Sequence, residues 1–274
     1  MDAFLESPLG RGYRGGAGGA REEPQLALRQ FLSARSEERQ RQLEALPAPP
    51  AGLGLRCAVC GPPRSGKTSL LFHYALRVAE AGEPVLFVAA RDKITRQPPL
   101  LPAGVSIEDA RLERIKMKYL ATRQDLLKLL SGIHMLEEAP GAIVIDDLHA
   151  YLGEGGGGEG GRKALVQLLG YLHEASEFLS SKAERGACKV VLSYLRGGEA
   201  MQTFFTIQRW IPLIYKVEPD GGGYRLEVHA NDKTKEHPIA GAQVLYLIGD
   251  ESLEVVQAHW ARRRSSGVFH RSPH

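Results

Sequence analysis

The sequence has little cysteine, few aromatic residues and no long apolar run. Its 274 residues include three cysteines, too few for a disulfide framework, so we expect a protein of a reducing compartment. No apolar stretch approaches the ~18 residues of a membrane-spanning helix, and we expect no membrane partner. The start of the chain carries Asp2 and Glu6 and lacks the cationic and apolar pattern of a secretory signal, so we expect a cytosolic or nuclear protein.

Acidic residues are absent from residues 261–274, which hold four arginines. The whole chain carries 35 Lys and Arg against 32 Asp and Glu, a formal net charge of +3; without these four arginines the balance is 31 against 32. The basic excess is therefore local and only weakly indicates nucleic-acid binding. Arg262, Arg263 and Arg264 form a cluster suited to DNA phosphates or to nuclear import, and a solvated tail is an equally open alternative.

Composition divides the chain into three parts. Residues 1–52 combine a Gly/Arg-rich stretch, a polar segment and a Pro-rich end, so we expect a largely disordered extension with a short amphipathic helix and a proline linker. Residues 53–250 are long enough for one domain with its own core. Residues 251–274 are expected to form a basic flexible tail.

The pattern within residues 53–250 is typical of an α/β protein. Apolar segments that match buried strands alternate with segments of helical spacing, which indicates parallel βαβ units. A Pro-Asp-Gly-Gly-Gly turn predicts a hairpin near the C-terminal end. We therefore expect a mostly parallel twisted sheet with an antiparallel C-terminal hairpin. The expected strands are 55–60, 85–89, 114–119, 142–145, 189–193, 213–217, 224–228 and 244–248.

One segment matches the phosphate-binding motif G-x-x-x-x-G-K-[ST], also called Walker A, between an apolar strand and an amphipathic helix. Its backbone N–H groups and the helix N-terminus would cradle phosphate oxygens. Lys67 would reach the β- and γ-phosphates, and the Thr68 hydroxyl would bind Mg²⁺. We therefore predict binding of ATP with Mg²⁺. The motif consists of Gly61, Pro62, Pro63, Arg64, Ser65, Gly66, Lys67 and Thr68.

An acidic residue follows another of the expected apolar strands. Asp146 is the first acid after the run 142–145, where a carboxylate can hold the metal that bridges the β- and γ-phosphates. A strand-end aspartate can equally cap the next turn. The presence of the P-loop favours the metal role, so Thr68 and Asp146 are the predicted metal ligands.

Cys57 and Cys60 form a CxxC pair, which is a pattern of zinc and redox sites. A single pair cannot complete a four-ligand zinc site, and both residues fall within the strand before the P-loop. We interpret them as structural thiols.

The order of these motifs carries a resemblance. It rests on Cys60–Phe72, Val85–Ala89, Ala142–Tyr151 and Ile214–Gly249, and it covers about residues 53–250. These segments resemble the RecA-type recombinase paralogue family, most of all its branch of SWIM-domain-protein-associated ATPases from Shu-type mediator complexes. The resemblance implies a RecA-like ATP-binding core, single-stranded DNA binding, and a nuclear role in homologous-recombination repair. Its implied partners are a SWIM-type zinc-finger protein and a recombinase with its paralogues.

Two departures from this family concern catalysis. RecA-like enzymes place a water-activating Glu just after the strand that follows the P-loop helix, and here only Asp92 is available nearby. They also use a Gln after the strand equivalent to 189–193, where this chain has Tyr194-Leu195-Arg196. Lys67 and Asp92 are therefore the only catalytic candidates, and we expect slow, DNA-stimulated hydrolysis.

The resemblance also implies DNA contacts in residues 196–210. Arg196 and Arg209 are the candidates for phosphate contacts there, because arginine beside aromatic rings can combine charge neutralisation with base stacking. The aromatic residues Phe204, Phe205 and Trp210 can instead form the apolar face of a helix that packs on the sheet.

Two other functional classes share the P-loop. A small-molecule kinase would need an arginine-rich lid and an acceptor-site carboxylate near the P-loop. Arg91, Arg96 and Arg111 could be assigned to such a lid, but the hairpin-rich C-terminal portion does not suit that class. A nucleotide-locked scaffold without turnover is favoured by the missing Glu and Gln.

Overall fold

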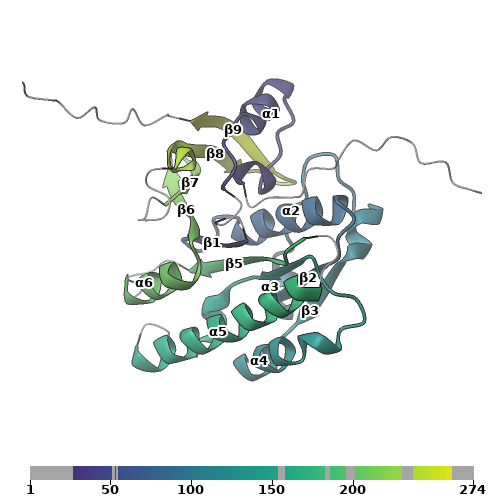
Figure 1. The fold of residues 1–274 in the computed structure, drawn as a ribbon. Helices are drawn as coiled ribbons and strands as arrows, with labels where there is room; N and C mark the ends of the chain where they lie inside the picture. Colours follow the sequence, from purple (N-terminus) through teal and green to yellow (C-terminus); the bar gives the residue numbers. More distant parts are fainter. Residues whose placement is uncertain are drawn as a thin grey trace, which may run out of the picture.

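Figure 1 shows a computed structural model of the chain, in which helices cover both faces of one large sheet. The structure describes residues 27–50, 53, 55–153, 158–182, 186–195, 201–229 and 237–260. Within these ranges the sheet has nine strands in the order β3-β2-β4-β5-β1-β6-β7-β8-β9. Strands β1 to β6 pair in parallel, and β6 to β9 pair antiparallel. The strands are β1 (Arg56–Gly61), β2 (Val85–Ala89), β3 (Ile115–Tyr119), β4 (Ala142–Ile145), β5 (Lys189–Leu195), β6 (Leu213–Asp220), β7 (Gly223–Val228), β8 (Ala242–Ile248) and β9 (Leu253–Trp260).

The helices form where apolar residues recur at helical spacing and where a polar residue or glycine starts the turn. Thr122, for example, accepts a hydrogen bond from the Asp125 N–H at the start of its helix, as the sequence predicts. The α-helices are α1 (Glu37–Glu44), α2 (Lys67–Glu80), α3 (Arg91–Arg96), α4 (Arg123–Ser131), α5 (Glu159–Lys182) and α6 (Met201–Trp210). The 3₁₀ helices are η1 (Leu28–Gln30), η2 (Ala110–Arg114), η3 (Ile133–Met135), η4 (Leu148–Tyr151) and η5 (Pro238–Gly241).

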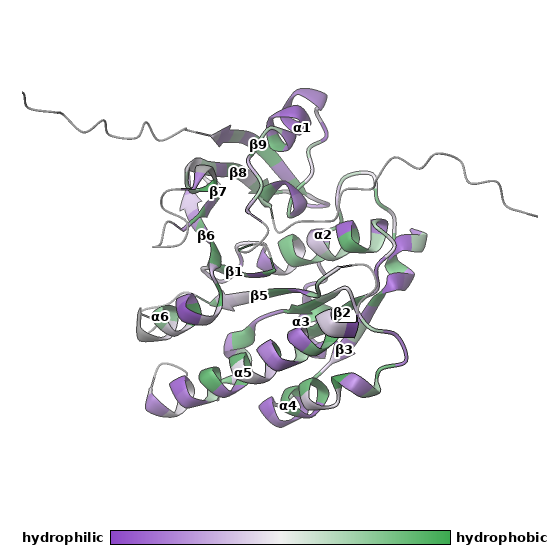
Figure 2. Ribbon diagram, viewed as in Figure 1, coloured by the Kyte–Doolittle hydropathy of each residue, from purple (hydrophilic) through white to green (hydrophobic). Residues whose placement is uncertain are grey.

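The sheet divides the hydrophobic core into two clusters. Helix α2 and residues from 28 to 46 pack on one face, and helices α4 and α5 pack on the other together with part of α6. Strands β2 and β4 contribute to both clusters and are buried throughout, as expected for parallel strands covered on both sides. Figure 2 shows polar colours on the outer turns of α1, α4 and α5. None of the helices in the described ranges is long and apolar enough to cross a membrane.

The expected α/β class, the parallel sheet and the C-terminal hairpin are confirmed, because the predicted strands all form. The structure differs from the expectation at both boundaries of the folded domain. Residues 27–46 belong to the core, since Phe31 and Leu43 are fully buried, although residues 1–52 were expected to be largely disordered. The sheet also continues past residue 250, because β9 pairs with β8 where a flexible tail was expected. Residues 261–274 lie outside the described part.

Candidate nucleotide-binding site

The P-loop connects β1 to α2 and requires glycine at both ends. Gly66 has a φ of 73°, a left-handed conformation that side chains other than glycine rarely adopt. A Cβ atom on Gly66 would also lie 3.2 Å from Leu253 Cδ2, and one on Gly61 would lie 2.7 Å from Val217 Cβ. The loop therefore adopts the tight turn that the motif predicts, with its end at the N-terminus of α2.

Lys67 is the first residue of α2 and folds back over the loop. Its Nζ donates to the Gly61 carbonyl at 3.0 Å and also to the Pro62 carbonyl. Burial lowers the pKa of Lys67 to about 8, and the nearby Asp147 opposes that shift. The ammonium group lies at the rim of the loop, where it can be offered to a phosphate.

Thr68 and Asp146 meet at this corner of the sheet. The Thr68 hydroxyl donates to Asp146 Oδ2 at 2.9 Å, and the Ser193 hydroxyl donates to Asp146 Oδ1 at 2.8 Å. Asp146 follows β4 directly, and its side chain is fully buried. The two predicted metal ligands are 78 positions apart in the chain, and the fold brings them into direct contact.

A residue that the sequence reasoning missed completes the corner. Lys93 Nζ lies 2.8 Å from Asp146 Oδ2 and 3.6 Å from Asp147 Oδ2. The adjacent Asp92, which the sequence suggested as a catalytic candidate, instead pairs with Arg96 on the outside of α3, where the Asp92 side chain is 73% exposed. The structure therefore brings an ammonium group, and not the Asp92 carboxylate, to the position after β2.

A cavity of about 550 Å³ opens above these residues. Lys67, Thr68, Lys93 and Asp147 line one side of it. The β8–β9 loop, residues 249–250, lines the other side, which the sequence did not predict. The cavity therefore lies between the P-loop and the antiparallel part of the sheet.

The antiparallel part also supports the loop from behind. The Tyr246 hydroxyl donates to the Ser65 carbonyl at 2.6 Å, and the Leu253 side chain packs on Gly66. Burial raises the pKa of Tyr246 well above its usual value, so its hydroxyl remains a donor at neutral pH. The P-loop conformation thus depends on a strand almost two hundred residues away.

The donor set at this corner suits a magnesium ion. The Thr68 hydroxyl and the Asp146 carboxylate are hard oxygen ligands of the kind that Mg²⁺ prefers. The described residues contain no group of three or more His, Cys, Asp or Glu side chains placed to hold a metal by themselves. An ion bound here would complete its shell with water and with nucleotide phosphates, which is how Mg²⁺ binds in P-loop proteins.

The arginines that a kinase lid would need are engaged elsewhere. The Arg91 guanidinium lies 4.5 Å from the centre of the Tyr119 ring. Arg111 pairs with Asp109 at 2.6 Å, and Arg96 pairs with Asp92. These three arginines are not among the residues that line the P-loop cavity.

Comparison with known proteins agrees with the predicted resemblance. The chain is 29% identical over 169 residues to the human ATPase SWSAP1, a match that covers 60% of this chain and 71% of that protein. It is 26% identical over 196 residues to the mouse ATPase SWSAP1, covering 68% of this chain and 66% of that protein. The chain is similar to the SWSAP1 ATPases. No family model matches it.

The fold resembles that of a solved recombinase. The crystal structure of the RadB recombinase superposes with a TM-score of 0.52 and 16% sequence identity, covering 74% of this chain and 91% of that chain. At this level of identity the likeness concerns the fold. The RecA-type fold and the resemblance to RecA-type recombinase paralogues, both expected from the motif order, are confirmed.

The two cysteines of the CxxC pair lie in β1 and point to opposite faces of the sheet. Cys57 belongs to the cluster beneath α2, and Cys60 belongs to the cluster beneath α5. Both are fully buried, and burial raises the pKa of the Cys57 thiol well above its usual value. The pair therefore cannot converge on one metal ion, which agrees with the structural interpretation.

Of the predicted DNA contacts, Arg209 is the one that the structure describes. It is exposed on α6 and lines a groove of about 840 Å³ between α5 and α6. Two cations that the sequence reasoning missed, Arg162 and Lys163, line the same groove beside Trp210. Arg196, Arg262, Arg263 and Arg264 lie outside the described residues.

The aromatic residues of α6 divide between the two interpretations. Phe204 and Trp210 are half-buried against the cluster beneath α5, as core packing predicts. Phe205 is 58% exposed. Only part of the aromatic face is therefore free for stacking on a base.

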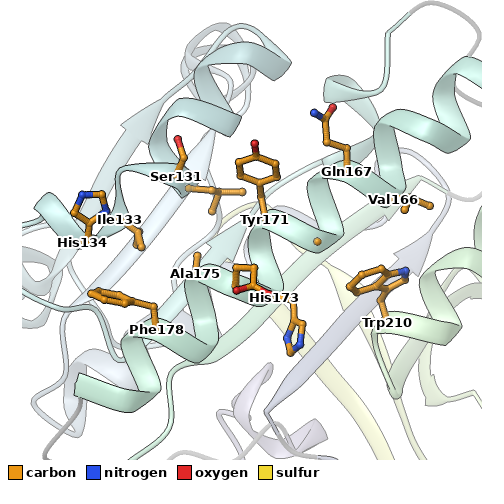
Figure 3. A pocket seen from close by; sticks show the side chains of 13 residues that line it. Ser131, Ile133, His134, Val166, Gln167, Tyr171, His173, Ala175, Phe178 and Trp210 are labelled. Carbon is orange, nitrogen blue, oxygen red and sulfur yellow. The ribbon is translucent and has the colours of Figure 1, made fainter.

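A second cavity adjoins the basic groove. Figure 3 shows this apolar cavity, about 670 Å³ in volume, with Tyr171, Phe178 and Trp210 around it. It lies between α4, α5 and α6, and its lining includes none of the P-loop residues. It is separate from the nucleotide site, and the sequence reasoning did not predict it.

Proposed function

We propose that this protein binds ATP and acts as a RecA-like accessory protein in homologous-recombination repair in the nucleus. The observation that carries the ATP assignment is the contact between Thr68 and Asp146 at 2.9 Å, beside Lys67 and under a cavity of about 550 Å³. These groups supply a phosphate-facing ammonium and the oxygen ligands of Mg²⁺ at one corner. The role in recombination is supported by the similarity to SWSAP1 and by the RecA-type fold.

Hydrolysis is proposed to be slow. Activation of the attacking water needs a base near the γ-phosphate. Asp92 points away from the cavity, and the Lys93 ammonium that lines it cannot accept a proton. Asp147, a carboxylate in the lining, is paired with that ammonium group at 3.6 Å. Turnover of several ATP molecules per second, lost in Lys67→Ala, would contradict this part of the proposal.

Single-stranded DNA is the proposed ligand of the groove between α5 and α6. Arg162, Lys163 and Arg209 can neutralise phosphates there, and the exposed edge of Trp210 can contact a base. The double variant Arg162→Ala/Arg209→Ala should weaken binding of an oligonucleotide several-fold and lower the salt dependence of its affinity. Arg114→Ala, which replaces an exposed arginine of η2, is the matched control. Equal affinities at low salt would exclude this groove as the DNA site.

A SWIM-type zinc-finger protein is the proposed partner, because the resemblance to the SWSAP1 branch implies it. The site of that contact can be narrowed by deletion. Residues 27–46 are part of the core, so a truncation should remove residues 1–26 only. Loss of the partner in a pull-down with this truncated chain would assign the contact to the removed residues, and retention would assign it to residues 27–274.

One assay distinguishes the proposal from its alternatives. ATP binding and turnover would be measured alone, with single-stranded DNA and with a panel of metabolites, in wild type, Lys67→Ala and the exposed control Lys128→Ala. We expect Lys67→Ala to weaken ATP binding by about 10- to 100-fold, the value of a charged hydrogen bond. DNA-stimulated turnover supports the accessory ATPase, metabolite phosphorylation the kinase, and tight ATP retention without turnover the scaffold.

A further inference from the structure

Lys93 lies in the helix that follows β2, where the C-terminal end of β2 is next to the C-terminal end of β4. Strand β2 pairs with β4, and the Asp146 N–H donates to the Val88 carbonyl at 2.9 Å. Helix α3 begins two residues after the end of β2, so its first turn lies beside the carboxylates that follow β4. This connection holds the Lys93 ammonium 2.8 Å from Asp146 Oδ2.

The position is one that needs a positive charge. The Asp146 side chain is fully buried, and a buried carboxylate is costly unless it is paired and hydrogen-bonded. Thr68 and Ser193 provide hydrogen bonds from hydroxyl groups, which carry no charge. Lys93 provides the charge, and its second contact with Asp147 at 3.6 Å joins both carboxylates to one ammonium group.

The charges at the cavity then balance without an ion. Lys67 and Lys93 offer two positive charges, and Asp146 and Asp147 offer two negative charges. Arg64 and Asp250, which also line the cavity, add one charge of each sign and leave this balance unchanged. Without Lys93 the same corner would carry two carboxylates against one ammonium group. A metal-free nucleoside triphosphate, which is strongly anionic, would be repelled by that excess negative charge. Mg²⁺ normally removes this repulsion by bridging the phosphates and a carboxylate.

We propose that Lys93 takes over this charge-balancing role, so that the protein binds ATP with only a weak dependence on Mg²⁺. The inference rests on the proposed ATP site and assigns Lys93 as a nucleotide-binding residue of that site. It also agrees with slow hydrolysis, because an ammonium group at this corner holds the phosphates without activating water. Lys93 is 34% exposed and lines the cavity, so it is accessible to a ligand.

The test is a set of affinities for ATP measured by fluorescence or calorimetry, in excess Mg²⁺ and in EDTA. Wild type should differ less than about tenfold between the two conditions, because the site is already neutral. Lys93→Ala should lose affinity in EDTA by about tenfold or more while it retains binding in Mg²⁺, because the ion can replace the missing charge. Lys93→Arg should behave as wild type, and so should the exposed control Lys128→Ala.

Circular dichroism guards against misfolding, and a double variant tests the charge balance. Lys93→Ala leaves the buried Asp146 without its ammonium partner, so its fold would be checked by circular dichroism. Lys93→Ala/Asp147→Asn removes one charge of each sign and should recover the weak dependence on Mg²⁺. If wild type binds ATP only with Mg²⁺, as strictly as Lys93→Ala does, the inference is wrong and the ATP site stands. If wild type binds no ATP in either condition, the proposed function itself fails.

Discussion

The two halves of the sheet contribute differently to the nucleotide site. The parallel half, β1 to β5, supplies the groups suited to phosphate and metal, which are Lys67, Thr68, Lys93 and Asp146. The antiparallel half, β7 to β9, supplies the opposite wall of the cavity and the bond from the Tyr246 hydroxyl to the P-loop backbone. Chemistry and support therefore come from different halves and can be perturbed separately.

Residues 27–46 connect the two halves. Phe31 stacks on Tyr74 of α2 with ring centres 5.2 Å apart and meets Tyr215 of β6 edge-on at 5.4 Å. Helix α1 packs against β9. Arg35 also donates to the Ser252 hydroxyl at 3.2 Å, in the loop that borders the cavity. This segment therefore stabilises the antiparallel half on the P-loop helix.

Among the variants that test the link between the two halves, Phe31→Ala is expected to have the largest effect on stability. The side chain is fully buried between two aromatic rings, so its loss should lower the free energy of unfolding by about 3–5 kcal/mol. Urea denaturation followed by circular dichroism measures the change. Phe205→Ala, at an exposed position of α6, should have little effect. If both variants were equally stable, residues 27–46 would not be part of the core.

A smaller loss of stability is expected at acidic pH, and it comes from a histidine in the parallel half. Burial of His73 in α2 lowers its pKa from 6.5 to about 4, although its Nε2 lies 3.0 Å from the Leu100 carbonyl. The folded protein therefore binds fewer protons than the unfolded chain between these two pH values. The stability from neutral His73 is complete above pH 6.5 and is lost as the pH falls toward 4.

The expected loss from this histidine is about 2 kcal/mol between about pH 7 and about pH 5. Urea denaturation at the two pH values measures it. His73→Gln keeps a hydrogen-bonding group toward Leu100 but cannot take up a proton in this range, so its stability should fall less. Equal pH dependence of the two proteins would show that His73 is not titrating in the core.

The sequence predicted the chemistry of the parallel half because its signals are local. The P-loop lies within eight consecutive residues, and Asp146 directly follows an apolar run that only a buried strand explains. Lys93 was missed because the choice between residues 92 and 93 depends on the rotation of the first turn of α3. That rotation is set by tertiary packing, and no spacing in the sequence reveals it.

The support from the antiparallel half was missed for a different reason. In β9 only Leu253 and Val255 are fully buried, so the strand has a weak apolar pattern. The segment that holds Phe31 and Leu32 was expected to belong to a largely disordered extension, because the core partners of these residues lie far away in the chain. Long-range contacts of this kind leave no local periodicity to detect.

The smallest effect is expected when the hydrogen bond between the antiparallel half and the P-loop is removed. Tyr246→Phe keeps the ring, which stacks on Tyr224 with centres 5.9 Å apart, and removes only the hydroxyl that donates to the Ser65 carbonyl. Loss of one buried hydrogen bond should lower the free energy of unfolding by about 1 kcal/mol and weaken ATP binding a few-fold, because the P-loop backbone is held less firmly. Tyr224→Phe, which leaves that bond intact, is the control. If Tyr246→Phe lowered stability but left ATP affinity unchanged, the antiparallel half would support the fold without organising the phosphate loop.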